Sequence, residues 1–151
     1  MTLRIVRGKC PLEQAITYWI AQILAALAAA AVVLFLKGYP PIPAPSEFHA
    51  ARALIAEFIG TFALAFVVLN VATAKGTEGN SFYGLAIGFT VLAQAIAVGS
   101  VSGGAFNPAV ATGISTLGLV SWSNFWVYLI GDLGGGLLAS AVFLYTNPKE
   151  D

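Results

Sequence analysis

The chain has 151 residues, of which 58% are hydrophobic and 9% are charged, and its mean hydropathy is +0.84. This composition lies outside the range of soluble globular domains and is that of an integral membrane protein. Seven Lys and Arg residues balance seven Asp and Glu residues, which excludes a charge-driven nucleic-acid partner. With one cysteine, Cys10, and one histidine, His49, we expect no intrachain disulfide, no metal cluster, no cofactor and no enzymatic activity.

Four apolar segments are long enough to cross a bilayer, whose hydrocarbon core of about 30 Å requires about 20 helical residues. They cover about residues 12–36, 53–73, 82–98 and 122–146. The prolines between the first two segments predict an extended loop. The sequence therefore predicts an all-α membrane protein with four transmembrane helices and the lipid bilayer as its surroundings.

A fifth segment, at about residues 99–118, is apolar, but glycines and Pro108 interrupt it, so it is not expected to span the membrane. Asn107 can cap a helix that has Pro108 in its first turn and continues through Ala109. About ten residues of helix reach about 15 Å, which is half of the bilayer. A helix that begins at membrane depth needs protein or a watery cavity around its end. We therefore predict a re-entrant loop and half-helix beside a transport pathway.

The half-helix also has an electrostatic consequence. Its N-terminus carries about half a positive elementary charge, which disfavours protons and other cations but not neutral molecules. The Asn107 side chain can donate an N–H to a permeating molecule, and an extended segment over 99–106 can line the path with backbone carbonyls.

Lys and Arg residues predict the orientation, because they are enriched at the cytoplasmic ends of membrane helices. With four spans, Lys37 and Arg52 lie on one side. The other side carries Arg4, Arg7, Lys9, Lys75 and Lys149. We therefore expect both termini in the cytoplasm, at the cell membrane, with the re-entrant segment entering from the external face.

Three motifs resemble those of the aquaporin family, the major intrinsic proteins. Residues 102–110 (SGGAFNPAV) resemble its signature loop and half-helix, residues 56–62 (AEFIGTF) its Glu-xxx-Thr helix, and residues 126–131 (WVYLIG) the start of its last helix. The resemblance implies a passive channel for water and small neutral solutes that excludes ions and protons. It also implies a homotetramer and a fold of two inverted repeats, each with three spanning helices and one half-helix.

An internal repeat predicts which part of that fold is present. Tyr18 and Ile20 align with Tyr128 and Ile130 at one constant offset, and the alignment continues along both segments. The first span is then the third helix of the first repeat, and the rest is a complete second repeat. The same offset places the other Asn-Pro-Ala just before Met1. We therefore expect residues 1–151 to form a single partial channel domain, with a tetramer only if the missing helices are supplied.

The resemblance also implies a selectivity filter of Ala95, Gly104 and Val110. Val110 stands where water-selective members have Arg, and Ala95 stands where they have His. The filter would be wide and apolar, as in plant vacuolar members, and would pass glycerol, urea or hydrogen peroxide with water.

Further residues are implied to line or support the pore loop: Gly103, Ala105, Phe106, Glu57 and Thr61. Glu57 is implied to accept hydrogen bonds from the loop backbone and to turn its carbonyls toward the pore. Asp132, where the family usually has Pro, lies at membrane depth, where a carboxyl group is costly. It can be protonated or bonded to a neighbouring helix, and the sequence leaves both open.

A second function, from a different class, stays open as well. One half-helix supplies only one positive helix terminus. The side of the pathway that two further spans would form in the family fold would be open. Two copies in the same orientation do not reproduce an inverted repeat. The alternative is therefore a non-conducting half-channel that only packs with full-length relatives.

Overall fold

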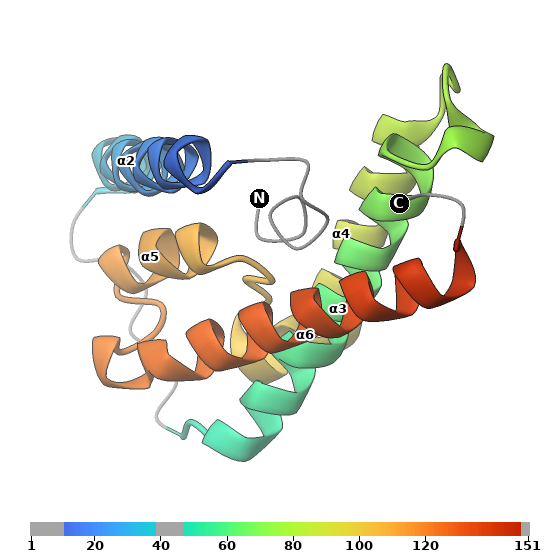
Figure 1. Cartoon of the computed structure of the whole chain (residues 1–151). Coiled ribbons are helices and arrows are strands. Elements are labelled where there is room, and N and C mark those ends of the chain that lie inside the picture. Colours follow the sequence, from blue (N-terminus) through green and yellow to red (C-terminus); the bar gives the residue numbers. More distant parts are fainter. Residues whose placement is uncertain (1–10, 39–46, 149–151) are drawn as a thin grey trace.

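A computed structural model describes residues 11–38 and 47–148, and every regular element in these ranges is helical. The long helices are α2 (Leu12–Lys37), α3 (Ala50–Ala72), α4 (Tyr83–Ser102) and α6 (Phe125–Thr146), as Figure 1 shows. The short α5 (Pro108–Thr116) lies between α4 and α6, and the 3-10 turns η1 (Lys75–Thr77) and η2 (Trp122–Asn124) complete the set. The four long helices are apolar enough to cross a membrane, so the all-α prediction is confirmed.

The end of α4 differs from the sequence expectation. The helix continues to Ser102, so the extended segment expected over 99–106 is wrong for its first half. Gly99 stays helical, because one glycine inside a helix costs only about 1 kcal/mol. The helix ends at Gly103, whose φ of 93° lies in the left-handed region and whose N–H donates to the carbonyl of Gly99. The non-helical part of the re-entrant loop is therefore short.

Helices α3 and α6 form the centre of the fold and pack closely along their lengths. Gly135 makes this approach possible, because a Cβ atom there would overlap the carbonyl oxygen of Phe58 on α3. One turn earlier, a Cβ at Gly131 would lie 3.2 Å from the carbonyl oxygen of Leu54. Small residues four apart let membrane helices pack backbone to backbone, as these two do.

The other helices attach to this pair more loosely. Helix α4 packs on α3, and α5 lies between α2 and α6. In Figure 1, α2 runs beside α5 and away from α3. Most of α2 and α4 is exposed, and a Cβ at Gly84 or Gly88 of α4 would meet nothing within 4 Å. These apolar faces are therefore available to lipid or to further protein.

Candidate functional site

The short helix α5 begins at the Asn-Pro-Ala motif. Asn107 is its N-cap, with extended backbone, and its Oδ1 accepts a hydrogen bond of 2.9 Å from the N–H of Ala109. Pro108 occupies the first turn, where its missing N–H leaves no intrahelical bond unmade. The nine residues rise about 14 Å, too little to cross a bilayer. The chain then turns back through η2 into α6.

Glu57 of α3 holds the loop that precedes α5. Its buried carboxylate accepts the N–H of Ala105 at 3.0 Å and the N–H of Phe106 at 2.6 Å. It also accepts the hydroxyl of Ser102 at 2.5 Å. Because a trans peptide points its N–H and C=O in opposite directions, the carbonyls of Gly104 and Ala105 face away from Glu57. The hydrogen bonds expected for Glu57 are thus present.

Phe106 has an unusual backbone conformation. Its φ of 51° lies in the left-handed region, which is costly for a residue with a side chain. Two contacts stabilise it: the N–H bond to Glu57, and the packing of its ring against Gly60 of α3. A Cβ at Gly60 would overlap that ring. Gly60 is therefore a structural requirement of the loop.

Tyr128 of α6 secures the other end of the loop. The side chain is fully buried, and its hydroxyl donates to the carbonyl oxygen of Ser102, the last residue of α4. Ser102 therefore links α3, α4 and α6. The sequence alone indicated no role for either residue. The available signal was a tyrosine hydroxyl within an apolar helix, which needs a hydrogen-bond partner when it is buried.

Asp132 of α6 is bonded to a neighbouring helix, which was one of the two alternatives. The Thr61 hydroxyl donates to its Oδ1 at 3.0 Å, and its side chain is 3% exposed. Its other oxygen, Oδ2, has no hydrogen-bond partner in the described part of the chain. Thr61 therefore contacts Asp132, whereas the loop is supported by Glu57 one turn earlier.

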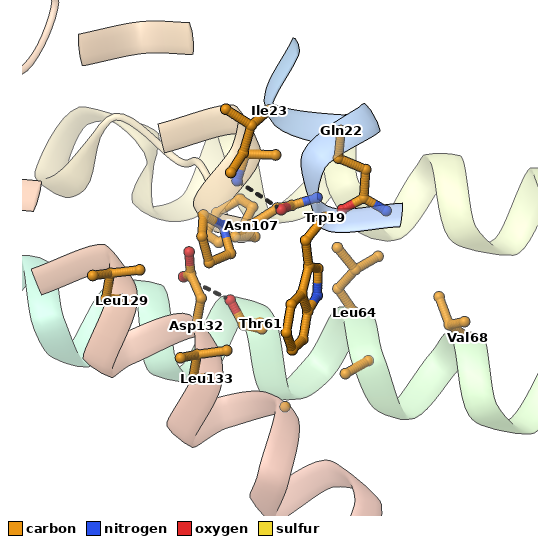
Figure 2. Close-up of a pocket in the computed structure, with 15 residues that line it drawn as sticks. Trp19, Gln22, Ile23, Thr61, Leu64, Val68, Asn107, Leu129, Asp132 and Leu133 are labelled. Atoms are coloured by element: carbon orange, nitrogen blue, oxygen red, sulfur yellow. Dashed lines mark hydrogen bonds between the residues drawn. The ribbon is translucent and has the colours of Figure 1, made fainter. Parts of the chain in front are cut away.

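A cavity of about 500 Å³ lies beside the start of α5. Figure 2 shows Asn107 above it, Thr61 and Asp132 on one side, and Trp19 and Gln22 of α2 on the other. Most of the remaining wall is apolar and comes from α3 and α6. The site is a mostly apolar cavity with a few convergent polar groups, which is typical of small-molecule sites.

Two of the three residues predicted as a filter, Ala95 and Val110, are exposed, whereas Gly104 is half-buried. Gly104 lies close to α4, because a Cβ atom added to Gly104 would be 3.3 Å from the Cα atom of Gly99. Gly99 follows Ala95 by one turn of α4. Ala95 and Gly103 are exposed, and Val110 on α5 is 44% exposed. The described helices thus leave Ala95 and Val110 open and do not close a ring around the three positions.

Comparison with known proteins identifies the family. Residues 2–143 match the family described as Major intrinsic protein. The chain is 34% identical over 142 residues to aquaporin TIP1-1 of Arabidopsis thaliana, an alignment that covers 91% of this chain and 56% of that protein. It is 36% identical over 141 residues to probable aquaporin TIP2-2 of Oryza sativa subsp. japonica, with the same two coverages.

Probable aquaporin TIP3-2 of Arabidopsis thaliana is 35% identical over 150 residues, covering 93% of this chain and 54% of that protein. The chain therefore spans about half the length of these relatives. The relatives are named as channels, and none of these names is that of an enzyme. The half-helix motif, the loop held by Glu57 and these matches agree: the chain belongs to the major intrinsic protein family.

Proposed function

We propose that this chain forms one side of a transmembrane channel for water and small neutral solutes. The observation that carries the proposal is the loop before α5, which Glu57 orients so that two carbonyls face away from α3. Asn107 follows directly, with its amide at the wall of a cavity. Carbonyl acceptors and an amide donor at the end of a half-helix can replace the hydration of a neutral molecule. The relatives' name, aquaporin, supports water as one permeant.

The selectivity that we propose has two parts. The positive end of α5 disfavours cations and protons. Ala95, Gly104 and Val110 form a filter without a fixed positive charge, wide enough for glycerol, urea or hydrogen peroxide. The exposure of Ala95 and Val110 supports this assignment, since filter residues must reach the pathway.

Within the family fold, we place α2 as the third helix of the first repeat and α3 to α6 as the second repeat. The internal repeat that aligns Tyr18 with Tyr128 supports this placement. The exposed faces of α2 and α4 are then contacts for the remaining helices and for a homotetramer. The basic N-terminal residues and Lys149, on which the cytoplasmic placement of both termini rests, lie outside the described residues.

A second function is favoured by those same exposed faces. The described helices leave Val110 and Ala95 open, so a pathway along them has no opposite wall within these residues. A chain of this kind can act as a non-conducting half-channel that packs with full-length relatives.

Stopped-flow light scattering on proteoliposomes of the 151-residue chain separates the two functions. If the chain conducts water, vesicles that contain it shrink faster under an osmotic gradient than empty liposomes do. Asn70→Ala serves as a control variant and should shrink as fast as the wild type, because the Asn70 side chain, near the end of α3, bonds only to its own helix. Water permeability equal to that of empty liposomes would reject the channel for this chain and leave the half-channel.

A further inference from the structure

Two carboxyl groups meet between α3 and α6. Glu57 and Thr61 are one turn apart on α3, and the Thr61 hydroxyl donates to the Oδ1 of Asp132 at 3.0 Å, as Figure 2 shows. A Cβ atom at Gly131, the residue before Asp132, would lie 3.0 Å from the Cβ of Glu57. With the two helices this close, the carboxyl group of Asp132 lies within side-chain hydrogen-bond reach of the carboxyl group of Glu57.

Both carboxyl groups are removed from solvent. The Glu57 side chain is fully buried, and that of Asp132 is 3% exposed. Lys and Arg side chains are absent from the lining of the cavity that Asp132 borders, so no fixed cation compensates a second negative charge there. Two carboxyl groups in contact at such a place do not both ionise, and the pair holds one proton. One of the two groups is therefore neutral.

The hydrogen bonds of Glu57 identify it as the charged member of the pair. Its Oε1 accepts the hydroxyl of Ser102 and the N–H of Ala105, and its Oε2 accepts the N–H of Phe106. Donated hydrogen bonds favour the ionised form of a carboxyl group. Asp132 receives only one such bond from the described residues. The proton therefore belongs to Asp132.

The count of acceptor sites also gives the direction of this proton. A carboxylate has about four acceptor sites. Glu57 uses three of them, which leaves one on Oε2. The Oδ2 of Asp132 is buried and has no donor among the described residues. Two carboxylate oxygens cannot bond to each other, but a proton on Oδ2 turns their contact into a hydrogen bond. The buried oxygen without a partner is then a donor, as buried polar groups are almost always paired.

We propose that Asp132 is a neutral carboxylic acid whose Oδ2–H donates to Glu57, and that it is a positioning residue for the re-entrant loop. Its proton acts in place of a counter-ion, because it allows Glu57 to stay charged and to hold the N–H groups of Ala105 and Phe106. Protonation and a bond to a neighbouring helix, the two alternatives left open by the sequence, thus hold together. The family usually has Pro at this position, which has no carboxyl group, so the contact belongs to this chain.

A loop held in this way is sensitive to alkaline pH. Loss of the proton places a second negative charge beside Glu57, and the two charges repel each other. The other ionisable group near the pair is Tyr128, whose hydroxyl donates to the carbonyl of Ser102. Helix α5 has no ionisable side chain, and α2 contributes only uncharged side chains to the cavity. The effect on permeation rests on the proposed function, whereas the protonation of Asp132 does not.

Infrared spectroscopy tests the proton without requiring conduction. The chain contains two aspartates, Asp132 and Asp151. Cell-free synthesis with isotope-labelled aspartate shifts the C=O band of a protonated aspartic acid and so identifies it. We expect this band in the detergent-solubilised wild type at neutral pH, its loss in Asp132→Asn, and its retention in the control Asp151→Asn. A wild type without the band, or a band that persists in Asp132→Asn, would overturn the proposal.

Water permeability of proteoliposomes tests the positioning role. Asn has the shape of a neutral Asp, with an oxygen for Thr61 and an NH₂ group for Glu57, so Asp132→Asn should stay within about twofold of the wild type at neutral pH. Asp132→Leu has no donor and should lose about tenfold, as for loss of a hydrogen bond to a charged group. The matched control is Ser140→Ala, a buried polar residue of α6 that bonds only within its own helix and should behave as the wild type does.

The pH profile separates the proton from a merely structural contact. Between neutral and alkaline pH the wild type and Ser140→Ala should lose about threefold in permeability, because the pair becomes doubly charged, whereas Asp132→Asn should not change. Equal profiles for the wild type and Asp132→Asn would overturn the positioning role. If the chain does not conduct, the channel is rejected, and thermal unfolding in detergent makes the same comparison. The midpoint of the wild type should then fall at alkaline pH and that of Asp132→Asn should not, and equal shifts would overturn the proposal.

Discussion

Glu57 determines the conformation of the re-entrant loop. Its carboxylate accepts two backbone N–H groups and one hydroxyl, and without it those donors are buried and unpaired. Phe106, with its left-handed backbone, depends on one of these bonds and on the space above Gly60. The loop is therefore a set of strained and polar groups that is stable only because α3 supplies complementary ones.

Glu57→Gln is the direct test of this dependence. The amide keeps one acceptor oxygen but turns an NH₂ group toward donors, so we expect the free energy of unfolding to fall by about 1–3 kcal/mol. Thermal unfolding in detergent, followed by circular dichroism, measures the change. Glu78→Gln, at an exposed carboxylate after η1, is the matched control. Equal unfolding midpoints for the two variants would contradict the role of Glu57.

The substitution Val110→Arg tests the proposed filter. Val110→Arg places a guanidinium on an exposed position of α5, where it narrows the path and adds a fixed cation. In a conducting preparation we expect glycerol and urea flux to fall at least tenfold relative to water. Stopped-flow shrinkage with each osmolyte gives the ratios. Ratios equal to those of the wild type would remove Val110 from the filter.

At the scale of elements, the α3–α6 pair sets the geometry of the site, because Glu57 and Thr61 lie on one helix and Asp132 and Tyr128 on the other. Gly135→Val tests this packing: its side chain would overlap the carbonyl of Phe58 and force the helices apart. We expect a loss of at least 2–3 kcal/mol of stability, as for overpacking. Gly88→Val on α4 meets open space and should change stability by less than about 1 kcal/mol. Similar losses for both would contradict the close α3–α6 contact.

The helix ends and the contact between α3 and α6 differ in how far the sequence predicts them. The start of α5 was predictable, because an Asn cap followed by Pro fixes a helix N-terminus locally. The end of α4 was not, since Gly99 and Gly103 look alike in sequence and only Gly103 adopts a positive φ. The Thr61–Asp132 bond joins residues 71 positions apart and depends on how α3 and α6 are rotated about their axes. No local pattern specifies that rotation.

At the scale of the whole molecule, the exposed apolar faces divide into those that would meet lipid and those that would meet a pathway. Cysteine labelling distinguishes them, after Cys10→Ser removes the only native thiol. A charged, water-soluble thiol reagent should label Ala95→Cys and Val110→Cys in proteoliposomes, because a thiolate forms only in water. Leu24→Cys on α2, at a residue that is 61% exposed in the structure, should stay unlabelled in lipid. Labelling of all three at one rate would reject a pathway along Ala95 and Val110.

The hydrogen bonds that hold the loop all join residues between Glu57 and Tyr128. None of them involves α2. During synthesis Tyr128 is the last of these residues to leave the ribosome, so the loop gains its final bond only when α6 has begun to enter the membrane. The re-entrant unit can then complete itself from its own segments, and α2 has only to dock against the finished α5. The hydrogen bonds that hold the loop can therefore form whether or not α2 has docked against α5.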